Sequence, residues 1–276
     1  MATLDEKRER LLEFIRRFDS CVVAFSGGVD SALVAKAAQV ALGEKAVAVT
    51  AVSASVAAGE LEQARQVARS IGLRHEVIET GEFENPAYTQ NAPDRCFHCK
   101  SELYTQLEHL TEKFAAAVVF NGANIDDAGD YRPGAKAAQQ HAVRSPLAEC
   151  GLSKSDVREL ARAWDLPVWD KPATPCLSSR VAYGEEVTPE RLHRIDQAER
   201  LLRSLGLDEV RVRYHRGDLA RLEVPLTAIE RLASEPVRGK LAAELKRLGF
   251  KYVTLDLEGF RSGSQNAVLP VVRVES

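Results

Sequence analysis

The chain has 276 residues, of which 45% are hydrophobic and 28% are charged, and its formal net charge is −3. This balance is typical of a folded globular protein and excludes disordered and fibrous classes, while the length allows a domain of roughly 180 residues beside a smaller one. The slight negative charge disfavours a long nucleic-acid partner, because no overall positive field is present to attract a polyanion.

The N-terminal segment, residues 1–19, has a charged helical pattern that lacks the apolar centre of a signal peptide. No apolar run in the sequence reaches the roughly 20 residues that a membrane-spanning helix needs. We therefore expect a cytoplasmic protein without a membrane partner. In that reducing compartment the five cysteines are poor candidates for a disulfide framework and better candidates for metal or thiol chemistry.

Short β-rich runs alternate with longer helical patterns in the first half of the chain. The predicted strands are residues 21–25, 46–50, 74–78 and 117–121, and the clearest helical patterns between them are 31–42 and 59–71. This alternation predicts an α/β domain with a parallel sheet and crossover helices. Further along, the pattern predicts a helix over 155–164, capped by Ser153 or Ser155, and a short strand over 167–169.

The order of elements changes after residues 171–184, which are rich in Pro and Ser. The pattern then predicts a helix over 189–205, strands over 209–214 and 220–224, a helix over 226–248 and a strand over 252–257. We interpret this second part as a smaller α+β domain. The expected domains are therefore residues 1–184 and residues 185–276.

A glycine-rich loop follows the first predicted strand and leads directly into a helix. It consists of Ser26, Gly27, Gly28, Val29, Asp30 and Ser31. Two glycines let the backbone turn tightly beside an anion, and the helix directs free N–H groups and its positive dipole end to the same place. The sequence therefore predicts a phosphate site, although an ordinary strand-to-helix turn capped by Ser or Asp is the alternative.

The loop lacks the Gly-Lys-Ser/Thr ending of a Walker A motif, so the groups that serve γ-phosphate transfer are missing. It resembles the PP-loop, Ser-Gly-Gly-x-Asp-Ser, of the ATP pyrophosphatases, whose domains are of the adenine nucleotide alpha hydrolase type. This resemblance implies that ATP loses pyrophosphate while AMP passes to a substrate. Adenylation turns a carboxylate into an acyl donor that releases AMP and accepts a sulfur nucleophile at neutral pH.

Three of the cysteines are candidates for metal or sulfur chemistry. Cys96 and Cys99 stand three residues apart at the apparent start of a helix, so they share a face and can reach one metal. The helix start, Arg95 and Lys100 favour thiolates there. Cys176 lies in a polar loop at the expected domain junction.

Three thiolates are one ligand short of a closed structural zinc site, unless His98 is the fourth. They also suit a cubane iron–sulfur cluster, which four cysteines normally hold and which here would keep one iron open. The alternatives are that the first two cysteines are incidental or zinc-binding thiols and that the third is an inert buried thiol. Cys21 and Cys150 are predicted to be packing residues, since free cysteine is often buried.

The chain resembles the LarE family over almost its full length, and the family comprises PP-loop sulfur transferases that build the nickel-pincer nucleotide cofactor of lactate racemase. Besides the phosphate loop, the resemblance rests on residues 130–134, Ser178-Ser179-Arg180 followed by Tyr183-Gly184, residues 210–213 and residues 252–263.

The resemblance implies that the substrate is pyridinium-3,5-biscarboxylic acid mononucleotide, whose carboxylates are adenylated and become thiocarboxylates. Some members sacrifice the sulfur of one cysteine, whereas others hold a [4Fe–4S] cluster on three cysteines that resemble Cys96, Cys99 and Cys176. This sequence matches the second kind. ATP with Mg²⁺, a sulfide or other sulfur donor, and assembly into a homohexamer are also implied.

The resemblance also implies roles for single residues. Pyrophosphate is assigned to Ser26, Gly27, Gly28, Asp30 and Ser31; the nucleotide or substrate phosphate to Arg144, Ser179, Arg180 and Arg261; adenine and ribose to Val52, Ser53 and Gly122. The last three follow strands, at the carboxyl edge where parallel sheets bind ligands. Glu199, Arg211 and Arg213 resemble the charged groups around the reactive cysteine, Cys176. Solvated side chains on a helix and a strand are the alternative for these three residues.

Three rival functions remain at this stage. A tRNA thiolase also combines a PP-loop with paired cysteines, although the acidic balance counts against it. A nucleotide-binding protein whose three cysteines hold zinc without turnover is the second. The third is a ligase that uses ammonia, resembling amidotransferases or NAD synthetase.

Overall fold

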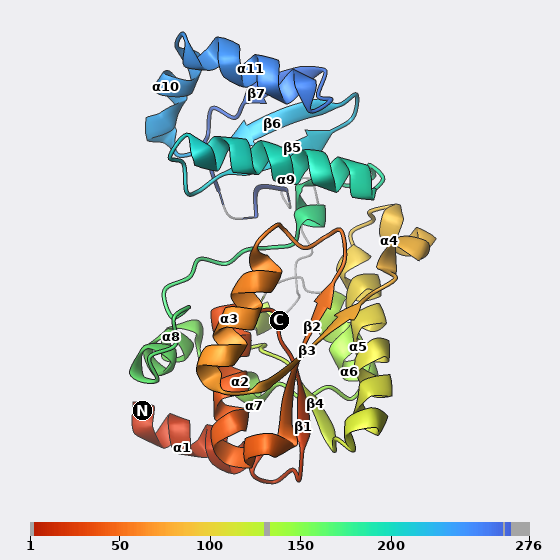
Figure 1. Ribbon diagram of the computed structural model, residues 1–276, viewed down its shortest axis with the longest axis vertical. Coiled ribbons are helices and arrows are strands. Elements are labelled where there is room, and N and C mark those ends of the chain that lie inside the picture. Colours follow the sequence, from red (N-terminus) through yellow and green to blue (C-terminus); the bar gives the residue numbers. More distant parts are fainter. Residues whose placement is uncertain (1–2, 130–132, 262, 266–276) are drawn as a thin grey trace. The chain divides into compact units, whose positions relative to one another are not determined.

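The structure is a computed structural model that describes residues 3–129, 133–261 and 263–265. The chain divides into two compact units, each containing two stretches of sequence (Figure 1). The first unit comprises the residues up to Glu82 together with Cys96–Thr174, and the second comprises Phe83–Arg95 together with the residues from Pro175 onward. The units differ from the expected domains, 1–184 and 185–276, in the placement of residues 83–95 and 175–184. The functional roles expected of those domains stay a prediction.

The first unit is built on a four-stranded parallel sheet with the order β3-β2-β1-β4. The strands are β1 (Cys21–Ala24), β2 (Ala46–Val52), β3 (Arg74–Glu79) and β4 (Val118–Phe120). β1 and β2 are nearly continuous runs of Val and Ala, as expected for strands that are covered on both faces. The predicted α/β class is confirmed.

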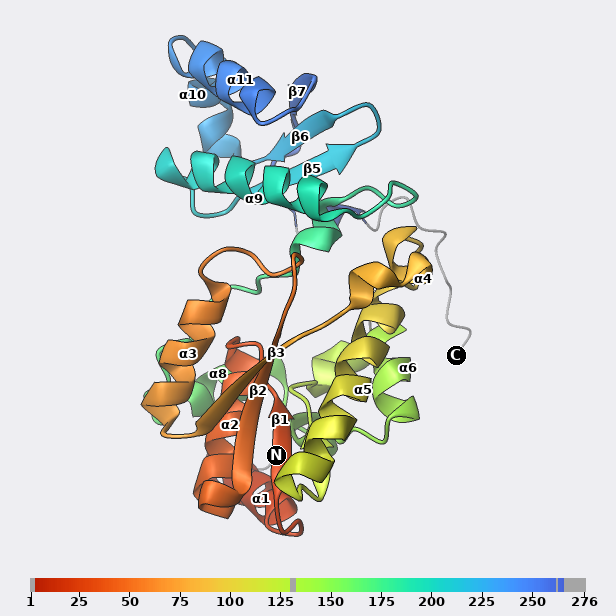
Figure 2. The same cartoon turned by 45° about the vertical axis from the view of Figure 1, so that its right-hand side comes forward.

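Helices cover both faces of this sheet. They are α1 (Leu4–Ile15), α2 (Val29–Leu42), α3 (Glu60–Ile71), α5 (Arg95–Phe114), α6 (Pro133–Gln140), α7 (Pro146–Glu149) and α8 (Lys154–Ala163), with the short 3-10 helices η1 (Gly43–Lys45), η2 (Glu82–Glu84) and η3 (Ile125–Gly129). Figure 2 shows α2, α3 and α8 on one face and α5 and α6 on the other. Successive residues of β1 alternate between the two layers, since Cys21 and Val23 pack with α2 and Val22 packs with α5 and α6.

The strand predicted over 167–169 is wrong. Backbone bonds from Trp169 N to Leu166 O and from Lys171 N to Val168 O, both 3.1 Å, fold this segment into turns instead. Val168 is buried in the first core, so its apolar character reflects packing. Pro167 also lacks the N–H group that a sheet position requires.

The second unit combines helices with a three-stranded mixed sheet, as the α+β pattern predicted. In the order β5-β6-β7, the first pair is antiparallel and the second parallel. Its elements are α4 (Pro86–Thr89), η4 (Leu177–Arg180), α9 (Pro189–Ser204), β5 (Arg211–His215), β6 (Leu219–Glu223), η5 (Leu226–Ala228), α10 (Ile229–Ala233), α11 (Val237–Arg247) and β7 (Tyr252–Leu255).

The single helix predicted over 226–248 is also wrong, because three short helices occupy this stretch. α10 ends at Ala233 and is followed by Ser234, whose backbone is extended, and α11 begins after Pro236. A proline has no N–H group for the helical ladder, and it disfavours helical geometry in the residue before it. The apolar spacing continues across this interruption. A prediction based on periodicity alone therefore gives one helix where the structure has separate ones.

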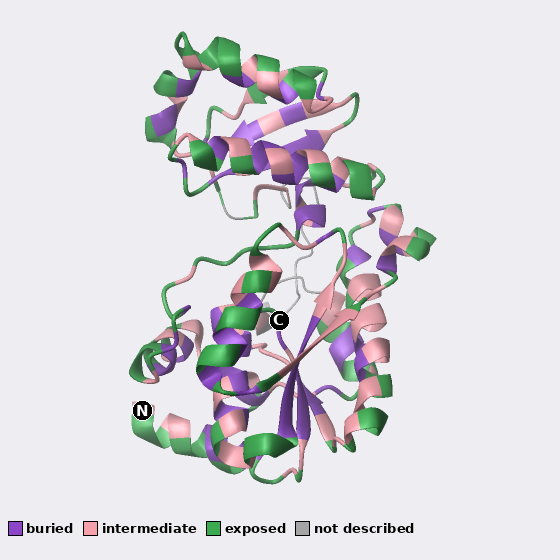
Figure 3. Ribbon diagram, viewed as in Figure 1, coloured by how far each residue is buried: buried purple, intermediate pink, exposed green. Residues whose placement is uncertain are grey.

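Figure 3 shows that the buried residues gather on the strands and on the inward helix faces of each unit. Among the helices that the structure describes, none is long and apolar enough to cross a membrane.

Candidate active site

The predicted phosphate loop connects the end of β1 to the start of α2. Gly27 has a φ of +73°, a left-handed conformation that favours glycine. A Cβ atom there would lie 2.9 Å from both Cα and Cβ of Ala64 in α3. The position therefore requires glycine both for its backbone and for its close approach to α3.

Two serine side chains fix the shape of this loop. Ser31 Oγ lies 3.1 Å from Ser26 Oγ, and it donates to the carbonyl oxygen of Gly28 at 3.0 Å. The N–H group of Gly28 donates in turn to Ser26 Oγ. α2 begins after Gly28 without a side-chain cap, so its first N–H groups stay available to an anion. This geometry favours the phosphate prediction over a turn capped by Ser or Asp.

Gly122, which follows β4, packs against the first turn of α2. A Cβ atom at this position would lie 2.8 Å from the backbone nitrogen of Ser31 and 3.0 Å from the carbonyl carbon of Asp30. Close beside it, Asn124 donates through its side-chain amide to Asp30 Oδ1 at 3.1 Å. The chain after β4 thus lines the phosphate loop, where the sequence placed a nucleotide contact.

Lys154 is a candidate site residue that the sequence analysis missed. It is the first residue of α8, and its amine forms an ion pair with Asp30 from 124 residues away. Ser153 caps α8 in a capping box with Asp156, and this local pattern shows that Lys154 opens a helix. No local pattern shows which loop the helix faces. The fold thus brings a lysine to a phosphate loop whose own sequence contains none.

Val52 ends β2, and Ser53 follows it at the carboxyl edge of the sheet, as predicted. The hydroxyl of Ser53 donates to Glu82 Oε1 at 2.5 Å, and Ser55 donates to the same oxygen. Glu82 is buried, and its Oε2 has no hydrogen-bond partner within the part of the chain that the structure describes. Glu82 therefore holds the loop after β2 in place, a contact that the sequence analysis did not foresee.

The cysteines fall into two groups by burial. Cys21 and Cys150 are buried, as predicted, and burial raises the pKa of Cys21 to about 12 and that of Cys150 to about 11. Cys96 and Cys176 are exposed and Cys99 is partly exposed, so the alternative of an inert buried Cys176 is wrong. Cys96 and Cys99 lie on the first turns of α5, and Cys176 directly precedes η4.

The chemistry of these three thiols fits a metal cluster, because all are reduced and none is enclosed in an apolar core. Cys96 and Cys99 belong to the first unit and Cys176 to the second. Over residues 3–129, 133–261 and 263–265, no group of three or more His, Cys, Asp or Glu side chains is gathered to hold a metal ion. The three-cysteine cluster therefore stays a prediction.

Glu199 is buried inside the second unit, so the alternative of a solvated helix-surface glutamate is wrong. Its carboxylate accepts from Arg180 Nε at 2.9 Å, from Arg203 at 2.9 Å and from the backbone N–H of Val212 at 3.2 Å. Both Arg180 and Glu199 have side chains that are only 1% exposed. The guanidinium of Arg180 is thus fully engaged within the protein, and its predicted phosphate contact stays untested.

Arg211 and Arg213 follow each other at alternate positions of β5. Arg213 is buried and pairs with Glu223 at 2.8 Å, which also excludes the solvated alternative for this residue. Arg211 is half-buried above the ring of Phe260. Burial, followed by the charge of Arg180, lowers the pKa of Arg211 to about 10, so it remains a cation at neutral pH. Two arginines near one edge of the sheet suit an anionic ligand.

The remaining predicted phosphate ligands have protein partners. Arg144 donates to Glu149 at 3.0 Å and lies over the rings of Phe14 and Phe18. Arg261 pairs with Glu258 at 2.7 Å. Their predicted phosphate contacts would have to replace or share these pairs, and they stay predictions. Ser179 donates to the carbonyl oxygen of Cys176. Residues 130–132 and 262, part of the motifs that carried the family resemblance, lie outside the described residues.

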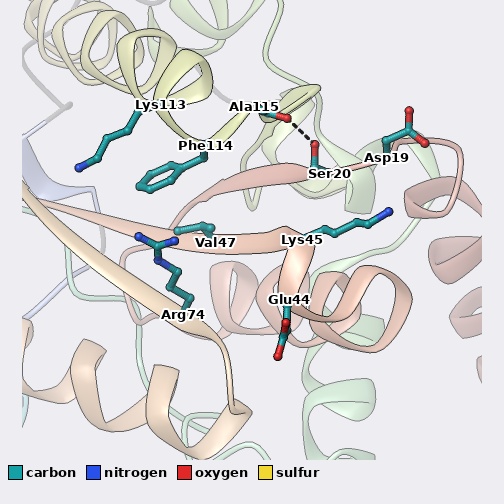
Figure 4. Close-up of a pocket in the computed structure, with 9 residues that line it drawn as sticks. All are labelled: Asp19, Ser20, Glu44, Lys45, Val47, Arg74, Lys113, Phe114 and Ala115. Carbon is teal, nitrogen blue, oxygen red and sulfur yellow. Dashed lines mark hydrogen bonds between the residues drawn. The ribbon is translucent and has the colours of Figure 1, made fainter.

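A shallow hollow of about 490 Å³ lies at the opposite, amino-terminal edge of the first sheet. Figure 4 shows Lys45, Arg74 and Lys113 around it, with Ser20 bonded to the carbonyl oxygen of Ala115. Arg74 already pairs with Glu76. Because parallel α/β sheets bind ligands beyond the carboxyl ends of their strands, the phosphate loop marks the nucleotide edge and this hollow does not.

The parallel sheet, the Ser-Gly-Gly-Val-Asp-Ser loop and the uncapped helix start define a PP-loop ATP pyrophosphatase domain. The family model for NAD synthase matches residues 10–104. An uncharacterized protein of Synechocystis is 48% identical over 96% of this chain and 99% of its own length. The pyridinium-3,5-bisthiocarboxylic acid mononucleotide synthase of Lactiplantibacillus plantarum is 37% identical over 98% of this chain and 97% of its own.

The chain therefore belongs to the LarE family, and it is an ATP-dependent sulfurtransferase. A more distant similarity connects it to a tRNA-specific 2-thiouridylase of Beijerinckia indica, which is 28% identical over 54% of this chain and 43% of that protein.

Proposed function

We propose that this enzyme converts the carboxylates of pyridinium-3,5-biscarboxylic acid mononucleotide into thiocarboxylates during nickel-pincer nucleotide biosynthesis. The observation that carries the substrate assignment is the similarity over 97% of the length of the mononucleotide synthase of Lactiplantibacillus plantarum. Location in the cytoplasm and assembly into a homohexamer belong to the same proposal.

The phosphate loop serves the first step. The N–H groups at the start of α2 and the hydroxyls of Ser26 and Ser31 bind the pyrophosphate part of ATP. Asp30 and Lys154 lie next to each other at this point, so the carboxylate would be available to hold Mg²⁺ and the amine to bind the phosphates. A substrate carboxylate attacks the α-phosphorus, pyrophosphate leaves, and an acyl-adenylate results.

Gly122 contributes to this step through its backbone. Its lack of a side chain lets the chain after β4 approach the start of α2, beside the nucleotide. Val52 and Ser53 present backbone groups for adenine and ribose at the neighbouring strand end, while Glu82 occupies the hydroxyl of Ser53. Because the Ser53 hydroxyl is engaged by Glu82, the backbone at the end of β2 recognises adenine.

The second unit supplies the anion site for the mononucleotide. Arg211 and Arg213 provide positive charge on β5, with Ser179 and Arg261 as further ligands. Glu223 holds the guanidinium of Arg213, which also donates to the carbonyl oxygen of Ser179 at 3.1 Å. A phosphate dianion bound here would orient the pyridinium carboxylates toward the sulfur source.

Cys96, Cys99 and Cys176 would hold a [4Fe–4S] cluster as the source of sulfur. Such a cluster, if bound, would supply sulfide for repeated transfer. The sulfur nucleophile attacks the acyl carbon, the bond to AMP breaks, and a thiocarboxylate remains.

The test is product counted per protein after anaerobic reconstitution with iron and sulfide. ATP and the biscarboxylated nucleotide should give many thiocarboxylates per chain, with the optical and EPR spectra of a cluster. Cys96→Ser, Cys99→Ser and Cys176→Ser should each abolish repeated turnover. Cys150→Ala is the matched control, since this cysteine is buried in the core and should leave turnover unchanged.

Other results would redirect the proposal. A colourless protein that forms at most one thiocarboxylate and loses H₂S from Cys176 is a sacrificial transferase. Colourless, zinc-containing protein without pyrophosphate release is a binding protein. Thiolation of tRNA in place of the nucleotide would favour the activity named for the Beijerinckia relative. No product from the biscarboxylated nucleotide would refute the substrate assignment.

A further inference from the structure

Among the described residues, the side chain of Arg180 donates its hydrogen bonds inside the second unit, around the backbone of the Cys176 loop. Its Nη1 donates to the carbonyl oxygens of Pro175 and Cys176, the latter at 3.0 Å, and to Ser179 Oγ at 3.1 Å. Its Nε and Nη2 donate to the two carboxylate oxygens of Glu199 at 2.9 and 3.4 Å. One guanidinium thus connects a buried carboxylate to the peptide groups on both sides of an exposed cysteine.

The backbone of Cys176 is held from a second direction as well. Its carbonyl oxygen accepts from the N–H group of Ser179 at 3.0 Å and from Ser179 Oγ at 2.8 Å. The thiol side chain itself is exposed. The loop therefore combines a fixed main chain with an accessible sulfur, an arrangement that a merely solvent-exposed loop does not need.

Glu199 is anchored independently of the loop. Its carboxylate accepts from the backbone N–H of Val212 in β5 and from Arg203 one turn along α9. Its neighbours at helical spacing, Ile195 and Leu202, lie in the core. Glu199 thus fixes Arg180 to the framework of α9 and β5, and all its oxygen atoms are engaged without a contact to the thiol.

We propose that Arg180 and Glu199 form a backbone clamp, defined as these two side chains, that fixes the direction of the Cys176 thiol. This inference rests on the proposed function of Cys176, and it deepens that function. The two residues are positioning residues, because they act on the sulfur through the peptide groups of Pro175 and Cys176. The clamp also gives Arg180 a role different from the phosphate contact that the family resemblance implied.

The test begins with Arg180→Lys, which keeps the charge but loses the planar fork that serves Glu199 and two carbonyls together. We expect sulfur transfer to fall about 100-fold, the scale reported for small misplacements of reacting groups. The first-turnover burst of pyrophosphate release with ATP and substrate should keep a rate within about twofold of the wild type, because adenylation precedes sulfur transfer. Glu199→Gln should show the same pattern more weakly.

Two measurements separate local positioning from a general loss of structure. Amide hydrogen exchange should accelerate in a peptide that covers residues 175–181, while peptides from α2 and β6 keep their wild-type rates. Arg180→Met combined with Glu199→Met removes both charges together, so it leaves no unpaired buried charge. This double variant should fold and should show the same selective loss. Arg203→Gln is the matched control, because Arg203 contacts Glu199 but not the loop.

Each outcome decides between the proposals. The clamp is supported if the first-turnover pyrophosphate release is normal, sulfur transfer is slow, and amide hydrogen exchange accelerates only in residues 175–181. A raised KM for ATP or substrate in Arg180→Lys, with pyrophosphate release lost, makes Arg180 a ligand residue and overturns the clamp. Unchanged sulfur transfer in the double variant also overturns it. If the wild-type enzyme gives no product at all, the proposed function fails, whatever the exchange data show.

Discussion

Lys154, the first residue of α8, forms an ion pair with Asp30 at the start of α2. The pair lies beside the uncapped N–H groups at the start of α2, and it brings a lysine to a loop whose own sequence contains none. Lys154 therefore belongs with Ser26 and Ser31 in the predicted pyrophosphate site.

We expect Lys154→Met to lower pyrophosphate release about 100-fold, since one preorganised donor to a developing charge is worth that much. The measurement is substrate-dependent pyrophosphate release at saturating and limiting ATP. Lys7→Met is the control, because Lys7 pairs with Asp156 on the same helix and lies in α1. Equal losses in the two variants would show that α8 stability, and not phosphate binding, is affected.

Gly122→Ala should weaken ATP binding at least tenfold and lower the free energy of unfolding by about 1–3 kcal/mol, the usual cost of overpacking. The added methyl group would meet backbone atoms of Asp30 and Ser31, which cannot move aside without distorting the loop. Calorimetric titration with ATP and urea unfolding measure the two effects.

Gly239→Ala is the control for the previous substitution. Gly239 lies inside α11, and a Cβ atom there would meet only the flexible end of the Glu235 side chain. It should leave ATP binding intact and stabilise the protein by about 0.5–1 kcal/mol. An unchanged ATP affinity in Gly122→Ala would contradict the close approach described above.

The five thiols should react at very different rates in the cluster-free protein. With iodoacetamide at pH 8, Cys96, Cys99 and Cys176 should be labelled readily, whereas Cys21 and Cys150 should resist until the protein unfolds. The raised pKa values of the two buried thiols, about 12 and about 11, leave almost no thiolate at that pH. Peptide mass spectrometry over time gives each rate, and rapid native labelling of Cys150 would contradict its placement.

Glu149 should make the free energy of unfolding depend measurably on pH in the acidic range. The hydrogen bond from Arg144 lowers the pKa of Glu149 from its usual 4.5. A carboxyl with a lowered folded pKa adds stability above its unfolded pKa and loses it as pH falls through the folded value. Glu149→Gln should therefore lower the free energy of unfolding by about 0.5 kcal/mol at pH 7, as for other exposed pairs.

The same difference between wild type and Glu149→Gln should shrink as the pH falls below 4.5. Urea unfolding followed by circular dichroism at several pH values provides the comparison. A difference that stays constant with pH would show that shape and packing, and not the charge of Glu149, cause it.

The fold was predictable wherever a local pattern carried the information. The run from Cys21 to Ser31 reads correctly as strand, loop and helix, because apolar runs, glycines and a new period follow each other directly. The strand predicted over 167–169 was wrong because its apolar residues suggested a strand, although only Val168 is buried and Trp169 is exposed in a turn. The single helix predicted across Pro236 was wrong because the apolar spacing continues through residues 234–236, where the helix is interrupted.

The candidate site divides in the same way. The phosphate loop is contiguous, so its residues were identified together. Lys154 and Glu82 were missed because sheet order and loop packing, which no sequence period encodes, decide their partners. Glu199 was weighed as a solvated residue, yet it stands four residues after Ile195 and three before Leu202, both in the core. That spacing could have placed it on the buried face of α9.

The serine contacts within the phosphate loop also bear on how ATP binds. Because Ser26, Gly28 and Ser31 hydrogen-bond to one another, the curvature of the loop is fixed without a nucleotide. The loop then loses little conformational entropy when ATP binds. The affinity is therefore determined mainly by the contacts with the phosphates and little by the cost of ordering the loop. Ser31→Ala should reverse this balance, adding an unfavourable binding entropy in calorimetry even where the enthalpy of the phosphate contacts persists.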